Sequence, residues 1–240
     1  MKALLERRRG LLYGRRKGPK LSAARQSLKQ DLLPKLTFRV GEGRDPRLYF
    51  DTDVADLWFE VGFGGGEHLV WQAAHHPDVG LIGAEPYEAG VAKLIAALAS
   101  DENRPLATRI RIYEGDARDV LAALPDKVLG RVFILFPDPW PKTRHHKRRF
   151  IQTEMLSTLA RVMRENAELR FASDDPGYFD WALERLTAHP CFSWQARVAL
   201  DWETRPEDWP ETRYEKKALH GRPLYLRFRR NDTSCAAGNS

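Results

Sequence analysis

The chain has 240 residues, of which 42% are hydrophobic and 30% are charged, proportions typical of a soluble globular protein with a large core. No apolar run approaches the roughly 18 residues of a membrane span, and the basic N-terminus lacks the apolar segment of a secretory signal. The only cysteines, Cys191 and Cys235, form no CxxC pair, which argues against a disulfide framework or a zinc cluster and predicts a cytoplasmic location.

The formal net charge of +6 is concentrated near the N-terminus. Residues 1–36 carry eleven lysines and arginines against two acids, a net charge of +9, so the rest of the chain sums to −3. A basic segment on a slightly acidic body favours nucleic acid as the partner over a merely solvated tail. We therefore predict a partly flexible basic arm over residues 1–50, a single folded domain over 51–230 and a frayed tail over 231–240.

Strands and helices alternate along the predicted domain. The hydrophobic patterns predict strands at 57–61, 79–85, 109–114, 131–136 and 168–172, and helices at 67–76, 87–100, 117–124, 151–163 and 178–188. Two later strands, at 193–200 and 223–229, have no clear helix between them and predict an antiparallel hairpin at one edge. The chain is therefore predicted to be an α/β protein with three layers, in which helices cover both faces of a mostly parallel sheet.

Ligands of such sheets bind beyond the carboxyl ends of the strands, and the first strand ends in a glycine-rich loop. Glu60 precedes this loop, whose first, third and fifth positions are Gly62, Gly64 and Gly66. The third glycine of a dinucleotide-binding loop is replaced by Glu67. A carboxylate repels a pyrophosphate but attracts a cation, so the pattern favours S-adenosylmethionine, with its sulfonium and ammonium groups, over NAD.

The next two strands also end in acids. Glu85 follows the second strand, where a carboxylate can accept hydrogen bonds from both hydroxyls of a ribose. Asp116 follows the third strand and is suited either to an adenine amino group or to the N-terminus of the next helix, and Ala117 leaves room for a ring. One residue could serve both purposes, and the sequence leaves these alternatives open.

The fourth strand is followed by the most specific segment of the chain. Asp138 lies among three prolines and Trp140, which could stack on a base or pack the loop. Lys142 begins a strongly cationic run and could hold a phosphate or a ribose. The residues of this run that are suited to phosphate groups are Arg144, Lys147, Arg148 and Arg149. A lone acid beside a run that attracts phosphate groups predicts a catalytic site that acts on RNA.

With these motifs the sequence resembles the bacterial tRNA (guanine-N7-)-methyltransferases from about Tyr13 to Phe228. Its most specific match is Phe-Pro-Asp-Pro-Trp-Pro-Lys over residues 136–142, followed by the cationic run. The resemblance implies a Rossmann-like class I methyltransferase fold that uses S-adenosylmethionine. It further implies methyl transfer to N7 of a tRNA guanine, at position 46 of the variable loop in tRNA convention.

The resemblance also assigns residues to the two substrates. It implies donor binding by Glu60, Glu85, Asp116 and Asp138, the last of which is also the expected catalytic residue. It implies nucleotide binding by Lys142, Asp174, Thr212, Arg213, Tyr214 and Glu215, and RNA binding by the run 144–149 and by Arg15, Arg16 and Lys17. Two features depart from the family pattern: Asp175 stands where an aromatic residue is common, and residues 164–167 lack the usual glycines.

Guanine N7 has a free lone pair, so it can attack an activated methyl group without first losing a proton. Asp138 could stabilise the charge that arrives on the ring or hold the base through its Watson–Crick edge, and the sequence does not separate these roles. The alternatives are a methyltransferase acting on another RNA and an NAD-dependent oxidoreductase. The paired histidines at 75–76 and 145–146 lack a ligand set, so we expect no metal, and we expect a monomer or a weak homodimer.

Overall fold

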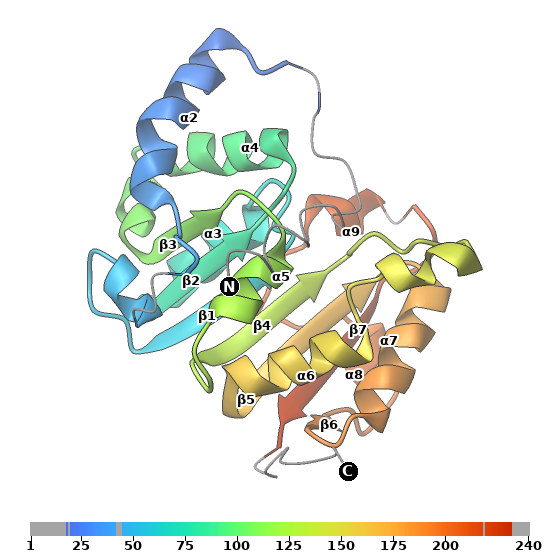
Figure 1. Ribbon diagram of the computed structural model, residues 1–240. Helices are drawn as coiled ribbons and strands as arrows, with labels where there is room; N and C mark the ends of the chain where they lie inside the picture. The colour runs from blue at the N-terminus through green and yellow to red at the C-terminus, as the bar shows by residue number, and fades with distance from the viewer. Residues whose placement is uncertain (1–17, 19, 42–44, 218, 232–240) are drawn as a thin grey trace. The chain divides into compact units, whose positions relative to one another are not determined.

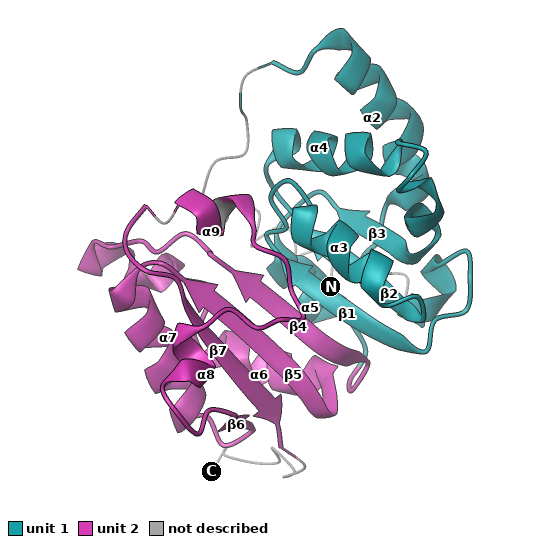
Figure 2. Ribbon diagram, turned by 180° about the vertical axis from the view of Figure 1, so that it is seen from behind, with its two compact units in different colours: residues 1–125 teal, residues 126–240 magenta. Residues whose placement is uncertain are grey.

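The chain forms a seven-stranded sheet with the order β3-β2-β1-β4-β5-β7-β6 in the computed structural model, with helices packed around the strands (Figure 1). The structure describes residues 18, 20–41, 45–217 and 219–231. It divides into two units, residues 1–125 and 126–240, which are coloured separately in Figure 2. The predicted fold class is confirmed, since the sheet is mostly parallel and has an antiparallel edge.

The strands of the first unit are all parallel, with β2 between β1 and β3. They are β1 (Asp56–Val61), β2 (Val79–Ala84) and β3 (Ile110–Tyr113), and all six residues of β2 are buried. Their helices are α3 (Glu67–His75), α4 (Glu88–Leu98) and α5 (Ala117–Ala123). Short 3-10 turns lie at Pro46–Tyr49 (η1) and Arg104–Arg109 (η2). Because neighbouring strands are parallel, their carboxyl ends lie at one edge, which brings the three strand-end acids of this unit together.

Helix α2 (Ala23–Leu36) lies within the stretch predicted as an arm, yet it belongs to the first unit. The Lys29 ammonium donates to Glu88 at 3.1 Å and to Glu114 at 2.6 Å, which ties α2 to α4 and to the end of β3. Burial alone lowers the pKa of Lys29, but these hydrogen bonds outweigh it and raise the pKa above its usual value. After the helix, the Phe38 N–H donates to the Ile112 carbonyl at 2.8 Å, alongside β3.

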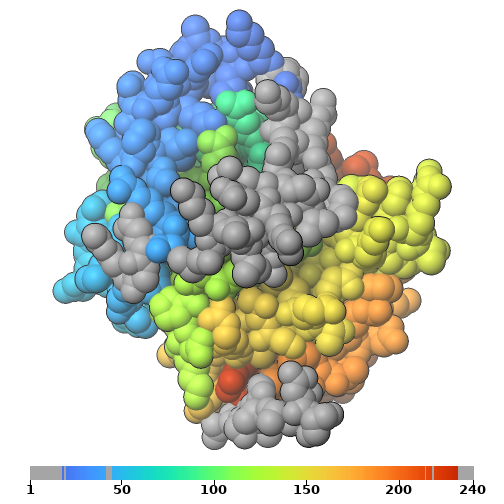
Figure 3. Space-filling view, in the orientation of Figure 1, coloured from blue at the N-terminus to red at the C-terminus, as the bar shows by residue number. Residues whose placement is uncertain are grey.

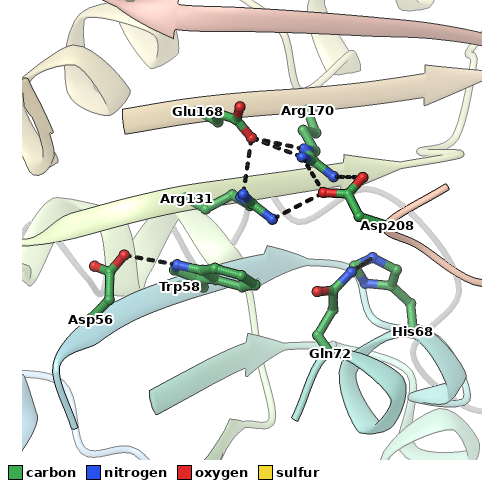
Figure 4. A network of polar contacts seen from close by, with 8 residues as sticks. All are labelled: Asp56, Trp58, His68, Gln72, Arg131, Glu168, Arg170 and Asp208. Carbon is green, nitrogen blue, oxygen red and sulfur yellow. Dashed lines mark hydrogen bonds and ion pairs between the residues drawn. The ribbon is translucent and has the colours of Figure 1, made fainter. Parts of the chain in front are cut away.

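The second unit contains the antiparallel edge. Its strands are β4 (Leu129–Leu135), β5 (Met163–Ser173), β6 (Phe192–Trp194) and β7 (Leu224–Arg230). Strand β5 is parallel to β4 and antiparallel to β7, and β6 is antiparallel to β7. The α-helices are α6 (Thr153–Val162), α7 (Pro176–Ala188), α8 (Leu200–Glu203) and α9 (Arg213–Lys217). On β5, Arg170 is only 2% exposed and is paired with Glu168 and Asp208 (Figure 4).

The predicted elements differ from the structure mainly after residue 190. The strand predicted at 193–200 ends at Trp194, because the N–H groups of Arg197 and Val198 donate to the Asp201 carboxylate and turn the chain into α8. In the described part of the chain, no helix has both the length and the apolar character that a membrane crossing requires.

Candidate active site

The glycine loop between β1 and α3 takes backbone conformations that other residues rarely adopt. Gly62, Gly64 and Gly66 have φ angles of 69°, 55° and 81°. A Cβ atom on Gly66 would lie 2.6 Å from the Leu94 side chain, so this glycine also allows α3 and α4 to approach. At Gly62 no atom of the described residues lies within 4 Å of the same point, which leaves space for a ligand against the backbone.

Glu85 connects the glycine loop to the end of β2. Its Oε2 accepts from the Gly64 N–H and its Oε1 from the Tyr87 N–H, each at 2.8 Å. The side chain is 7% exposed. The contact of this carboxylate with ribose hydroxyls stays a prediction. On the other side of the loop, a Cβ atom on Gly90 would lie 2.3 Å from the Gly64 carbonyl oxygen.

Glu60 is held by a residue that the sequence analysis did not single out. Its Oε2 lies 2.9 Å from Nδ1 of His68, on the first turn of α3, and the His68 Nε2 lies 3.1 Å from the Gln72 Nε2. Figure 4 shows the His68 and Gln72 side chains together on this helix. Glu60, His68 and Gln72 are 3%, 2% and 0% exposed. The sequence contained one signal of this contact, since a histidine follows the strand-end acid by eight residues and only a short loop separates them.

Asp116 caps the helix that follows β3. Its Oδ1 accepts from the Arg118 N–H at 3.0 Å, and the Arg118 guanidinium lies 3.3 Å from both carboxylate oxygens. The structure thus shows the N-cap role that the sequence left open, and it adds a cation beside this acid. Contact with an adenine amino group stays a prediction. The adjacent Ala117 is buried at the start of α5.

The loop after β4 is strained and firmly anchored in the second unit. Phe136 and Trp140 have positive φ angles of 50° and 47°, which are unusual for residues other than glycine. Arg149 holds the loop: its Nε donates to the Pro139 carbonyl at 2.8 Å and its Nη1 to the Gly177 carbonyl at 3.0 Å. The guanidinium also lies over the rings of Tyr178 and Trp181, at 4.9 and 5.0 Å.

This anchoring corrects the RNA-binding role predicted for Arg149. Its side chain is 3% exposed, and its guanidinium binds backbone carbonyls and aromatic rings instead of facing solvent. Burial lowers the pKa of Arg149, although the group stays charged at physiological pH. The sequence placed it at the end of a cationic run, and no local pattern distinguished it from its neighbours.

The carboxyl of Asp138 is partly desolvated although the side chain is exposed. The surrounding protein atoms raise its pKa above the usual range through desolvation. Because the residue is exposed, solvent limits this effect. Desolvation removes part of the stabilisation that water gives to the ionised form of Asp138. A positive charge nearby would replace that stabilisation.

The remaining cationic residues divide into an exposed and a packed group. Lys142, Arg144 and Lys147 are exposed on and before the turn η3 (Thr143–Arg148). The segment 142–148 belongs to the yellow-green part of the surface in Figure 3. Arg148 is half-buried over the Trp140 ring, 4.9 Å from its centroid. This contact supports a packing role for Trp140 over stacking on a base. The exposed group keeps the geometry expected of phosphate ligands.

Asp174 and Asp175 have different partners. Asp174 Oδ2 accepts from the His220 N–H at 3.1 Å, and its side chain is 14% exposed. Asp175 is the N-cap of α7, with its Oδ1 accepting from the Tyr178 N–H at 2.7 Å. The aspartate at position 175, where the family often has an aromatic residue, is therefore explained by its role as a helix N-cap. The departure at 164–167 is also explained, since Asn166 supplies the positive φ, 63°, that a glycine would otherwise provide.

Thr212 and Glu215 form a capping box at the start of α9. The Glu215 N–H donates to Thr212 Oγ1 at 3.1 Å, and the Thr212 N–H donates to Glu215 Oε2 at 3.3 Å. The other oxygen, Oε1, accepts from the Tyr225 hydroxyl at 2.5 Å and lies 3.3 Å from the Arg205 Nε. Glu215 is only 8% exposed, so it is a buried acid with fixed partners. Its partners Tyr225 and Arg205 were not found from the sequence.

For some predicted site residues the structure describes little or nothing. Arg213 is exposed on α9, and nothing is described of the Tyr214 side chain. Arg15, Arg16 and Lys17 lie outside the described residues. Their roles stay predictions. Among the described residues, no group of three or more histidine, cysteine, aspartate or glutamate side chains is placed to hold a metal ion.

Comparison with known proteins identifies a family. Residues 54–225 match the sequence profile of a family described as "Putative methyltransferase". The tRNA (guanine-N(7)-)-methyltransferase of Rhodospirillum rubrum is 51% identical over 233 residues, which cover 94% of this chain and 90% of that protein. The protein of the same name from Paramagnetospirillum magneticum is 48% identical over 222 residues, covering 91% and 92% of the two chains.

Solved structures share the fold at lower identity. A 16S rRNA (adenine(1408)-N(1))-methyltransferase variant from Catenulisporales acidiphilia, solved with cosubstrate SAM, is 19% identical with a TM-score of 0.54, covering 77% of this chain and 90% of that one. The 16S rRNA methyltransferase KamB is 17% identical with a TM-score of 0.53, covering 82% and 98%. These likenesses show the fold alone. The extent and identity of the sequence matches show that this chain belongs to the tRNA (guanine-N7-)-methyltransferase family.

Proposed function

We propose that this protein transfers a methyl group from S-adenosylmethionine to N7 of a guanine in tRNA and so forms 7-methylguanosine. The observation that carries the proposal is the set of three strand-end acids around an open glycine loop, in a chain 51% identical to a tRNA (guanine-N(7)-)-methyltransferase. An acid-lined loop suits a cationic donor and opposes a pyrophosphate, so NAD fits these residues poorly.

The residues of the first unit fit this donor. The donor supplies an activated methyl group on its sulfonium when it is bound. Glu60 would attract the positive charge, Glu85 would accept from the ribose hydroxyls, and Asp116 would accept from the adenine amino group. Among the described residues, the open space at Gly62 and the contact of Glu85 with the loop N–H of Gly64 support these assignments.

The residues of the second unit would act on the tRNA. Asp138 would stabilise the positive charge that develops on the guanine ring, or hold the base through its N–H donors. Its strained, anchored loop supports a role that depends on orientation. Lys142 and Asp174 would contact the nucleotide, and Arg144 and Lys147 the RNA backbone. By family resemblance the target is position 46 of the variable loop, and the protein acts as a soluble cytoplasmic enzyme.

Incubation of the purified protein with methyl-labelled S-adenosylmethionine and bulk tRNA tests this function. We expect labelled 7-methylguanosine in the nucleoside digest and none of the other methylated nucleosides. Sequencing by chemical cleavage at 7-methylguanosine should then map the label to position 46. A label on adenine, or on rRNA but not on tRNA, would contradict the proposed substrate.

The exposed part of the cationic run should account for much of the salt dependence of tRNA binding. In the double variant Arg144→Gln/Lys147→Gln, the slope of log affinity against log salt should fall by about 0.7 to 0.9 for each phosphate group that is no longer neutralised. Binding titrations at several salt concentrations measure this slope. The double variant Arg227→Gln/Arg229→Gln, on two exposed residues of β7, is the control for removal of charge alone. An equal change in this control would assign the slope to net charge.

A further inference from the structure

We infer that His68 is a positioning residue for donor binding, which holds the Glu60 carboxylate in place for the cationic part of S-adenosylmethionine. This inference rests on the proposed function, because it assumes that Glu60 faces the donor. It concerns a part of the site that the sequence motifs do not mark. It follows from the different surroundings of the two oxygens of the Glu60 carboxylate.

The first observation is that one oxygen of Glu60 is held while the other is left over. Oε2 lies 2.9 Å from the His68 Nδ1, and both side chains are almost fully buried. Among the described residues, Oε1 has no hydrogen-bond partner. Oε1 is not among the described side-chain atoms that are both fully buried and unpartnered, so it stays accessible to a ligand or to water. The arrangement therefore fixes the carboxylate with one oxygen reserved for a donor atom or cation.

The second observation concerns the proton on the imidazole. The Gln72 amide is oriented with Nε2 toward the His68 Nε2, at 3.1 Å. An amide nitrogen only donates, so in this orientation the His68 Nε2 accepts and the ring proton is on Nδ1. The Nδ1–H then donates to Glu60. This contact orients the carboxylate through one oxygen and leaves the other available to a cation.

The third observation is the place of this chain of contacts in the fold. Glu60 is on β1, one residue before its end, and His68 and Gln72 lie one turn apart on α3, so the contacts span the glycine loop. These contacts connect β1 to α3, the two elements that flank the glycine loop. The loop itself is held separately, by the Gly64 N–H on Glu85. Removal of the His68 imidazole should therefore release the Glu60 side chain while the loop stays in place.

The test compares His68→Leu with His68→Asn. Leucine removes the donor, whereas the asparagine amide can place an N–H close to the position of Nδ1 but cannot become charged. We expect His68→Leu to weaken binding of S-adenosylhomocysteine and S-adenosylmethionine roughly 10-fold in calorimetry, the usual scale for a hydrogen bond to a charged group. The donor KM should rise by a similar factor, whereas kcat and the tRNA Kd should change less than about twofold.

The conservative variant and a second position separate positioning from general stability. His68→Asn should recover most of the donor affinity, and Gln72→Leu should weaken donor binding less than His68→Leu does. If His68→Leu folds poorly, the comparison of His68→Asn with Gln72→Leu still tests the idea. Unchanged donor affinity in both His68 variants, or equal decreases in kcat and donor affinity, would overturn it. If wild-type protein binds the donor but forms no 7-methylguanosine, the proposed function fails instead, and Glu60→Gln then shows whether donor binding needs the carboxylate.

Discussion

Replacement of Asp138 by alanine should reduce kcat for methyl transfer by roughly 100- to 1,000-fold, the range seen when one preorganised polar group that stabilises the transition state is removed. The physical reason is that guanine becomes cationic as the methyl group arrives, and a fixed carboxylate nearby stabilises that charge. Binding of tRNA should change little, because Asp138 is a single acid on a surface whose affinity comes mainly from cations. Single-turnover methylation and filter binding measure the two effects separately.

Asp138→Asn is the matched control for the role of charge. Asparagine keeps the size of the side chain and one hydrogen-bond acceptor. If the carboxylate acts through its charge, the asparagine and alanine variants should be similarly slow. If it holds the base through the Watson–Crick edge, asparagine should retain part of the activity. Near-wild-type turnover in Asp138→Ala would remove Asp138 from the mechanism altogether.

The raised pKa of Asp138 also predicts a pH dependence. Desolvation favours the neutral acid, so this carboxyl gains its proton at a higher pH than an ordinary aspartate does. The ionised form is the active one, and kcat/KM should therefore fall as pH decreases through this raised pKa. The acidic limb should disappear in Asp138→Asn, whose side chain does not titrate. A limb that persists in this variant would belong to another group.

Replacement of Arg149 by methionine should affect catalysis and stability while leaving RNA binding nearly unchanged. The change removes the donors to the Pro139 and Gly177 carbonyls, which should lower the free energy of unfolding by about 1–3 kcal/mol. Freed from this anchor, the Asp138 loop should lose its alignment, and kcat should fall by about 10- to 100-fold. Thermal denaturation and single-turnover rates measure these two changes.

The matched control is Arg144→Met, which makes the same substitution at an exposed residue of the same run. It should reduce the salt dependence of tRNA binding and leave the unfolding free energy within about 0.5 kcal/mol of the wild-type value. The two variants should thus show opposite patterns. A reduced salt slope in Arg149→Met with unchanged stability would mean that Arg149 reaches RNA after all. Arg149→Lys should behave nearly as the methionine variant, because an ammonium cannot span both carbonyls in the same plane.

The strands and helices of the sheet could be predicted because their hydrophobic patterns are local. The predicted strand at 57–61 and the helix at 67–76 match β1 and α3 to within one residue at each end. The capping role of Asp116 was also accessible, since an N-cap depends on the residues that immediately follow. The mostly parallel sheet and its antiparallel edge followed from element order and connection length.

The tertiary roles of polar residues could not be predicted in the same way. Arg149 reads as one more cation in a run, and only its contact with Gly177, 28 residues later, shows that it is buried. Glu215 on α9 meets Tyr225 on β7 through a hydrogen bond between side chains, which no local pattern describes. Helix α2 was missed because its polar sequence and internal Pro34 give a weak helical signal, and its contacts through Lys29 are long-range.

The position of α2 determines where the chain could be shortened to separate RNA binding from donor binding. Deletion of residues 1–36 would remove a segment with a net charge of +9, but it would also remove Lys29. Glu88 and Glu114 would then be left without their shared cation, close in sequence to the two acids, Glu85 and Asp116, that are assigned to the donor. Weak donor binding by such a fragment would be mistaken for a contribution of the basic segment. A fragment that begins at residue 18 keeps these ion pairs and gives the cleaner comparison.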